Sequence, residues 1–108
     1  KSEPKLDFDR LGKIRSMVDI PLVLHGASGV PYDAVQNAIE KGICKVNIAT
    51  ELKIPFSNAI KEYFNENPNA SDPRQYLVPA KKAMYDVVVE KIKMCKSENK
   101  AYNCNYNL

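Results

Sequence analysis

The chain has 108 residues, enough for one small domain, and 44% of them are hydrophobic, as in an ordinary globular protein. Lysine and glutamate are interleaved and the formal net charge is only +3, which disfavours a nucleic-acid partner. No apolar stretch reaches the ~20 residues of a transmembrane helix, and the start lacks the apolar segment of a signal peptide, so neither membrane binding nor secretion is expected.

The beginning of the chain predicts a helix followed by a buried strand. Residues 6–18 carry an imperfect apolar stripe at helical spacing, and either Asp7 or Asp9 suits the position that caps a helix. Residues 20–24 form a short apolar run with proline only near its start, which is typical of a strand covered on both faces.

A second helix and a second strand follow in the same order. Residues 31–41 keep their apolar positions on one face, with Pro31 suited to the first helical position and Gly42 to the position just after the last turn. Residues 43–48 predict a strand, in which Cys44 is expected to be a small buried residue. The three cysteines show no metal-ligand spacing, which indicates reduced thiols and a cytoplasmic protein.

The rest of the chain predicts two helices joined by a loop. Residues 49–51 are predicted to open the next helix, and apolar positions follow helical spacing from Leu52 to Phe64. Because proline breaks an established helix, the regular part is expected to begin at Pro55, after one irregular turn. Residues 65–73 are rich in Asn, Pro, Ser and Asp, which indicates a loop. Residues 76–97 have a continuous apolar side and predict a long helix.

Both predicted strands end in polar residues, which is where α/β folds place their ligands. His25, the only histidine, ends the first strand, and residues 26–29 follow it as Gly-Ala-Ser-Gly before the next helix. Glycines let backbone N–H groups approach a ligand, and a helix N-terminus attracts an anion. If the alternating faces of both strands point into the interior of the fold, His25 and Asn47 lie together at one mouth, formed by the carboxyl ends of the strands. This edge of the sheet is predicted to bind a phosphate.

Two parallel strands leave a sheet with two open edges, so the pattern is expected to belong to a larger, closed sheet. A (β/α)₈ barrel takes about 250 residues, and this chain supplies only its last quarter. The fold class predicted for residues 1–108 is therefore α/β, as the C-terminal portion of a (β/α)₈ TIM barrel: the last two strands and helices plus a C-terminal helix.

Three segments of the chain can be compared with the sequence motifs of known families. Residues 21–29 are Pro-Leu-Val-Leu-His-Gly-Ala-Ser-Gly, residues 45–51 are Lys-Val-Asn-Ile-Ala-Thr-Glu, and residues 72–74 are Asp-Pro-Arg. Together they resemble the class II, zinc-dependent ketose-bisphosphate aldolases, most closely the tagatose-bisphosphate branch and then the fructose-bisphosphate aldolases. The resemblance implies a (β/α)₈ barrel in which these strands are the seventh and eighth, with residues 66–97 as a loop and C-terminal helical extension of the same domain.

The resemblance implies a role for each matching position. His25 matches a histidine ligand of a catalytic zinc, and Arg74 matches an arginine that reaches a neighbouring subunit's site and meets the substrate's other phosphate. Two loops match those that bind the triose and its phosphate, the first being Gly26, Ala27 and Ser28 and the second Asn47, Ile48, Ala49 and Thr50. Gly26 also matches a position that helps to hold a monovalent cation, Na⁺ or K⁺. The implied partners are a phosphorylated sugar, the rest of the barrel, and further copies in a dimer or tetramer.

The activity implied is reversible cleavage of a ketose 1,6-bisphosphate, tagatose or fructose, to dihydroxyacetone phosphate and glyceraldehyde 3-phosphate. Zinc polarises the ketone and stabilises the enediolate that forms as the carbon–carbon bond breaks. In the family, two other zinc histidines and an acid/base aspartate come earlier in the barrel, and this chain lacks them. Because such a zinc needs three protein ligands, the chain alone is expected to be inactive.

The sequence leaves other interpretations of the same residues open. The chain could be a non-catalytic phosphate-binding or assembly module derived from such a barrel, or part of a different barrel enzyme that acts on a phosphorylated substrate. Ser28 and Thr50 could serve only as helix caps. His25 could be a hydrogen-bonded structural residue, and Arg74 a solvated charge. An Asp-His pair and another His shortly upstream of residue 1 would favour the lyase.

Overall fold

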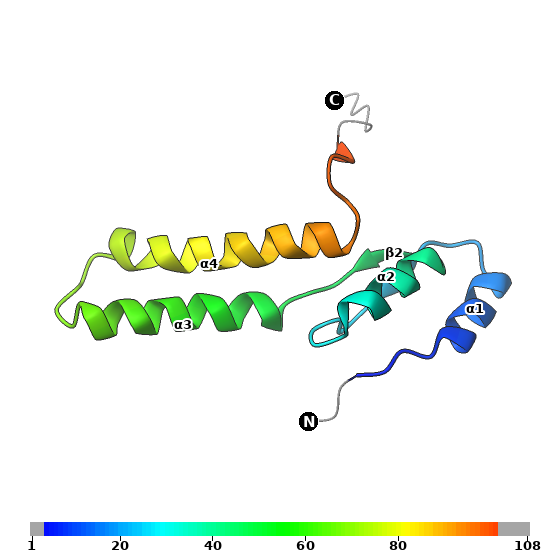
Figure 1. The fold of residues 1–108 in the computed structure, drawn as a ribbon, viewed down its shortest axis with the longest axis horizontal. Helices are drawn as coiled ribbons and strands as arrows, with labels where there is room; N and C mark the ends of the chain where they lie inside the picture. Colours follow the sequence, from blue (N-terminus) through cyan, green and yellow to red (C-terminus); the bar gives the residue numbers. More distant parts are fainter. Residues whose placement is uncertain (1–3, 102–108) are drawn as a thin grey trace.

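The computed structural model describes residues 4–101. Two long helices, α3 and α4, lie side by side as a hairpin, and a two-stranded sheet with α1 and α2 lies beyond one end of it (Figure 1). None of the helices in the described part of the chain is both long and apolar enough to span a bilayer. The elements in chain order are α1 (Phe8–Met17), β1 (Leu22–Leu24), α2 (Tyr32–Glu40), β2 (Ile43–Val46), α3 (Thr50–Glu66) and α4 (Pro73–Met94).

Helix α1 begins at one of the two predicted caps. The Asp7 carboxylate accepts a hydrogen bond from the Arg10 N–H at 2.9 Å, which satisfies one of the amides left free at a helix start. At the other end, the Arg15 guanidinium donates to the Val18 carbonyl at 3.0 Å. Asp7 is therefore the N-cap, and the helix lies inside the range that the sequence predicts.

Strands β1 and β2 form a parallel two-stranded sheet that is connected through α2. Leu22 lies opposite Ile43, and Leu24 lies opposite Val46. Both strands are shorter than predicted, and β1 starts late because Pro21 has no N–H with which to extend the ladder. The observed order of helix, strand, helix and strand confirms the predicted α/β pattern.

The ends of α2 show how the chain turns from this helix into β2. Pro31 is the N-cap residue rather than the first helical residue, and it provides no side-chain cap. Gly42 occupies the predicted position after the helix, where its φ is +111° and its N–H donates to the Ile39 carbonyl at 3.0 Å. A Cβ added at Gly42 would lie 2.8 Å from the Arg15 side chain, which would have to shift, but it is the backbone angle that requires glycine here.

A small apolar core lies where α2 meets the end of α4. Val35 and Met94 are buried there, and Leu24 and Val46 of the sheet pack against them. The Gln36 side-chain amide donates to the Met94 carbonyl at 3.2 Å, which fixes the last turn of α4 on α2. Because these residues come from both halves of the chain, the end of α4 joins the hairpin to the sheet.

Cys44 is exposed, so the prediction of a buried core residue is wrong. Ile43 beside it is buried, whereas Cys44 and Lys45 both contact solvent. The prediction assumed a sheet that is covered on both faces, and a sheet of two strands covers its own residues only partly. Cys95 is a half-buried free thiol, and Cys104 lies outside the described residues.

Helix α3 begins at Thr50, within residues 49–51 that are predicted to open it, but it is a regular α-helix already before Pro55. The Ala49 carbonyl accepts hydrogen bonds from the N–H groups of Leu52 and Lys53 at 3.0 and 3.2 Å, and these two bonds close the first turn. Pro55 lies inside the helix and removes only the one bond that its missing N–H would donate to the preceding turn. The prediction of an irregular turn before Pro55 was wrong because a proline this close to the N-terminus leaves the first turn intact.

Helix α4 also begins earlier than predicted, at Pro73 rather than at Tyr76. The Asp72 carboxylate caps it by accepting the Arg74 N–H at 2.9 Å, and proline suits a first helical position because no N–H is needed there. Farther into the hairpin, the rings of Phe64 and Tyr76 pack with their centroids 4.9 Å apart. A cap and an aromatic contact thus hold the start of α4 against the end of α3.

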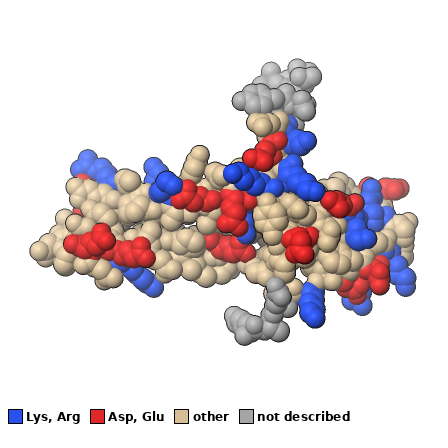
Figure 2. Space-filling model, viewed as in Figure 1, with Lys and Arg blue, Asp and Glu red and all other residues tan. Residues whose placement is uncertain are grey.

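The surface combines mixed charge with exposed apolar side chains. On the face shown in Figure 2, acidic and basic side chains are intermixed and form no large region of one sign. Several large apolar side chains are largely in contact with solvent, namely Met17 (80% exposed), Ile20 (66%), Tyr85 (64%) and Val78 (61%). The buried core is small in comparison with this exposed apolar area.

We expect the 108-residue chain on its own to associate or to unfold without cooperativity. Within residues 4–101 each strand is paired on one side only, and open strand edges and apolar patches both promote association. Sedimentation velocity measures the association state, and scanning calorimetry measures the cooperativity. A monomer with a sharp two-state melting transition would contradict this expectation.

Candidate functional site

The carboxyl ends of β1 and β2 bring two polar residues together. The Asn47 N–H donates to the Leu24 carbonyl at 3.0 Å, and the Asn47 carbonyl accepts from the Ala27 N–H at 3.4 Å. These bonds carry the pairing past the end of β2. The Asn47 side-chain amide nitrogen lies 3.0 Å from His25 Nδ1, so the two residues share one mouth, as the strand alternation predicts.

His25 is exposed, and Asn47 orients its ring. The roles in this contact depend on the ring tautomer: the amide NH₂ group donates to Nδ1 when the ring proton is on Nε2. Metal binding through Nε2 requires the opposite tautomer, in which the Nδ1–H donates to the Asn47 amide oxygen after the amide turns over. In both arrangements Asn47 occupies Nδ1, so Nε2 is the ring nitrogen of His25 that is left for a ligand.

Residues 26–29, here called the glycine loop, form a tight turn after β1. Gly26 has a φ of +66° and Gly29 a φ of +79°, values that residues with a Cβ rarely adopt. The Val30 N–H closes the turn by donating to the Ala27 carbonyl at 3.1 Å. A Cβ placed on Gly26 would meet no atom within 4 Å, so the space in front of this glycine is open.

The start of α3 offers free backbone donors next to the glycine loop. Its N-cap residue, Ala49, provides no side-chain cap. Among residues 4–101, the N–H groups of Thr50 and Glu51 donate to no protein acceptor. Free amides at a helix N-terminus, together with the helix dipole, favour an anion. The two segments that follow the strands can therefore bind a phosphate between them.

Ser28 and Thr50 are not helix caps, so the alternative that they serve only in that role is wrong. The N-cap of α2 is Pro31 and that of α3 is Ala49. Ser28 is half-buried in the glycine loop, and Thr50 is exposed in the first turn of α3. The Ile48 side chain packs against the apolar core, so only its backbone can contact a ligand.

Glu51, which the sequence does not single out as a site residue, links the two segments. The Gly29 N–H donates to Glu51 Oε1 at 2.7 Å, and the carboxylate also pairs with the Lys91 ammonium of α4. Burial alone raises the pKa of Glu51, but hydrogen bonds from Lys91 and Gly29 outweigh it, so the pKa lies below its ordinary value. No periodicity marks this contact, because its partners are distant in the sequence.

Arg74 lies away from the strand ends. It belongs to the first turn of α4 at the far end of α3 (Figure 1). Helix α3 has 17 residues and therefore separates the two places by about 25 Å. The Arg74 guanidinium donates to the Asp72 carboxylate at 2.7 Å, which lowers the pKa of Asp72 and raises that of Arg74. The structure therefore does not bring Arg74 to His25 within one chain.

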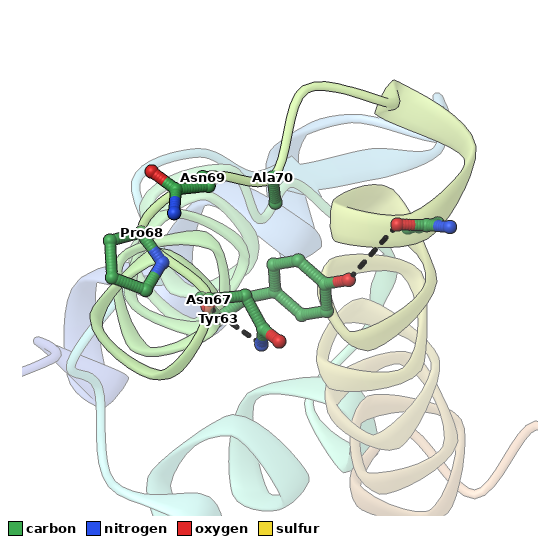
Figure 3. Close-up of a pocket in the computed structure, with 6 residues that line it drawn as sticks. Tyr63, Asn67, Pro68, Asn69 and Ala70 are labelled. Carbon is green, nitrogen blue, oxygen red and sulfur yellow. Dashed lines mark hydrogen bonds between the residues drawn. The ribbon is translucent and has the colours of Figure 1, made fainter.

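The turn between α3 and α4 contains a hollow of about 260 Å³. In Figure 3 the Tyr63 ring lies across it, with the hydroxyl donating to the Gln75 side-chain oxygen at 3.5 Å. The Asn67 amide donates to the Tyr63 carbonyl at 3.1 Å. None of the predicted site residues lines this hollow, so it is separate from the candidate site, and its polar contacts stabilise the turn before Asp72.

The residues at the mouth do not form a metal centre by themselves. Over the described part of the chain, no three His, Cys, Asp or Glu side chains lie close enough together to hold an ion. His25 has a side chain of the type that binds zinc, but a catalytic zinc needs three protein ligands and an open position. A zinc at this mouth therefore requires ligands from outside residues 4–101.

Comparisons with known proteins agree on one family. The sequence matches the family described as fructose-bisphosphate aldolase class-II over residues 1–100. The structure is similar to that of the YdjI aldolase from Escherichia coli K12, with a TM-score of 0.78 and 38% identity over 89% of this chain. It also shares its fold with the fructose-bisphosphate aldolase Fba from Campylobacter jejuni, with a TM-score of 0.69 and 22% identity over 85% of this chain.

The chain spans only part of these two proteins. It covers 35% of the YdjI chain and 34% of the Fba chain, which is consistent with the predicted C-terminal portion of a (β/α)₈ barrel. The sequence match includes both strand ends and the start of α4. The match over residues 1–100, together with the likeness to YdjI, shows that the chain belongs to the class II fructose-bisphosphate aldolase family.

Proposed function

We propose that this chain supplies the triose-phosphate loops and one zinc ligand of a barrel enzyme. The enzyme reversibly cleaves a ketose 1,6-bisphosphate, tagatose or fructose, to dihydroxyacetone phosphate and glyceraldehyde 3-phosphate. Membership of the class II aldolase family supports the reaction class. The observation that carries the proposal is the 3.0 Å contact between His25 and Asn47, because it holds a metal-binding ring beside two segments with phosphate-binding donors.

In this proposal the phosphate of the triose lies between the glycine loop and the start of α3. The first segment consists of Gly26, Ala27 and Ser28, and the second of Asn47, Ile48, Ala49 and Thr50. Because the N–H groups of Ala27 and Asn47 already donate to backbone carbonyls, the donors proposed for the phosphate are the other amides and the two hydroxyls. Neither segment contains Lys or Arg, so backbone amides and hydroxyls must supply much of the attraction. Charge-assisted hydrogen bonds of this kind contribute about 1.5–3 kcal/mol each.

His25 serves as one zinc ligand in the proposed enzyme, and the remaining ligands and the acid/base aspartate come from the rest of the barrel. The turn at Gly26 is the proposed place for a monovalent cation, Na⁺ or K⁺, because Gly26 matches the family position that helps to hold one and a Cβ there would meet no atom within 4 Å. We also propose a cytoplasmic location, which the free thiols of Cys44 and Cys95 support.

Arg74 acts in a neighbouring subunit in this proposal, so the enzyme is a homo-oligomer. The position of Arg74 at the tip of the hairpin supports a role outside its own chain (Figure 1). Helix α4 also exposes Val78 (61%), Tyr85 (64%) and Ile92 (40%). These residues recur at heptad spacing along one face, a pattern that suits contact between helices of two copies.

Replacing His25 with alanine in the complete aldolase is expected to remove zinc and activity together, because the ring is one of three proposed ligands. Elemental analysis gives the zinc content, and a coupled assay of triose phosphate gives kcat. Cys44→Ser is the control, since Cys44 is exposed on the neighbouring strand and is not a proposed ligand. A His25→Ala enzyme with full zinc and unchanged kcat would make His25 a structural residue.

Ser28→Ala and Thr50→Ala are each expected to raise KM by about ten- to a hundredfold, which corresponds to the loss of one charge-assisted hydrogen bond. Zinc content should stay normal, because neither hydroxyl is a proposed ligand. Ser57→Ala provides a matched control, since Ser57 is exposed on α3 away from the strand ends. If Thr50→Ala leaves the affinity for dihydroxyacetone phosphate unchanged, the start of α3 does not bind the phosphate.

Arg74→Ala is expected to weaken binding of the bisphosphate ketose more than binding of dihydroxyacetone phosphate, because Arg74 is proposed to contact the other phosphate. The measurement compares how far the substitution raises KM for the ketose with how far it raises the inhibition constant of dihydroxyacetone phosphate. Arg10→Ala is a close control, since Arg10 also pairs with the N-cap aspartate of its own helix. Equal effects of Arg74→Ala on the two ligands would argue against this role.

A further inference from the structure

Three elements meet at the Glu51 carboxylate. Glu51 lies in the first turn of α3, accepts the Gly29 N–H of the glycine loop at 2.7 Å, and pairs with Lys91 of α4. The side chains of Lys91 and Glu51 are only 18% and 27% exposed, so water screens the pair less than it screens a surface ion pair. The proposed function makes no use of this cluster.

The contact with Gly29 holds the two proposed phosphate-binding segments in one arrangement. Gly29 ends the glycine loop with a φ of +79°, and Glu51 belongs to the same turn of α3 that offers free amides. A carboxylate that accepts the Gly29 N–H ties the loop to the helix start by a charge-assisted hydrogen bond. Donors from separate segments bind one ligand well only when such contacts fix their relative positions.

The same carboxylate places a negative charge beside a site proposed for a phosphate dianion. An unpaired carboxylate there would repel the phosphate and offset the attraction of the α3 N-terminus. The Lys91 ammonium resolves this conflict, because it neutralises Glu51 at contact distance. The other acidic neighbour of Lys91 is Glu90 at 3.5 Å, whose side chain is 61% exposed and therefore better screened by water.

We propose that Glu51 is a positioning residue that orders the glycine loop for phosphate binding, and that Lys91 neutralises it. This inference rests on the proposed function, because it takes the ligand of the glycine loop to be a phosphate. It gives α4 a part in substrate binding although no residue of α4 in this cluster touches the substrate. A structural ion pair would stabilise the protein in the same place without changing phosphate affinity.

The test compares Glu51→Gln, Lys91→Met and the double variant in the complete, zinc-loaded aldolase. Calorimetry with inorganic phosphate as the probe measures affinity, steady-state assays separate KM from kcat, and thermal melting reports stability. Lys82→Met is the matched control, because Lys82 forms an exposed ion pair with Asp86 on the same helix, 2.5 Å between Nζ and Oδ1. It should leave phosphate affinity and KM unchanged.

Lys91→Met is expected to weaken phosphate binding by about tenfold, equivalent to about 1.4 kcal/mol, and to raise KM with little change in kcat. The reason is that the charge of Glu51 is left unpaired beside the phosphate. The double variant should recover most of this affinity, because glutamine still accepts the Gly29 N–H and carries no charge. If the ion pair is purely structural, the double variant should show no recovery and should bind phosphate no better than Lys91→Met.

If Lys91→Met does not fold, a comparison of phosphate affinity between Glu51→Asp and Glu51→Gln still tests the inference. Aspartate retains the charge but is one methylene too short to reach both partners, so it should bind phosphate more weakly than glutamine does. Equal phosphate affinity in wild type and Lys91→Met, no recovery in the double variant, or equal affinity of the two Glu51 variants overturns the inference and leaves the aldolase assignment intact. A wild-type enzyme that neither binds phosphate nor cleaves the ketose overturns both.

Discussion

The hydrogen bond from the Asn47 N–H to the Leu24 carbonyl, 3.0 Å long, is the contact on which the site depends. It continues the parallel pairing beyond β2 and sets the residues that follow the two strands side by side. His25 and Asn47 then meet at 3.0 Å, and the segment that follows Asn47 begins α3 with free N–H groups. A shift of this pairing by one residue would turn one of the two side chains to the opposite face and separate them.

Helix α4 supports this pairing through two contacts near its end. Its last turn buries Met94 against Val35, and one turn earlier Lys91 pairs with the carboxylate that accepts the Gly29 N–H. The other end of α4 carries Arg74 at the tip of the hairpin. In the proposed oligomer, the two ends of α4 therefore serve two different active sites, one in its own chain and one in a neighbouring copy.

The contact of His25 with Asn47 was predicted on the condition that the alternating faces of both strands point inward, and this alternation follows from local sequence patterns. Other features depend on contacts that no local pattern contains. The effect of Pro55 depends on which bonds close the first turn of its helix, and the exposure of Cys44 depends on how many strands cover it. Glu51 was missed because its partners are brought to it only by the packing of α4 against α3 and of both against the glycine loop.

The distance along the chain between the two sides of the core sets an order of events during synthesis. The hydrogen bond between Gln36 and Met94 spans 58 residues, and a contact of such separation costs loop entropy before it adds any stability. The contacting residues of the α3–α4 hairpin are closer together in the sequence, so the hairpin can form independently of this contact. Met94 supports the two strands only once the last turn of α4 is in place, and the same holds for the pairing of Lys91 with the Glu51 carboxylate that binds the glycine loop.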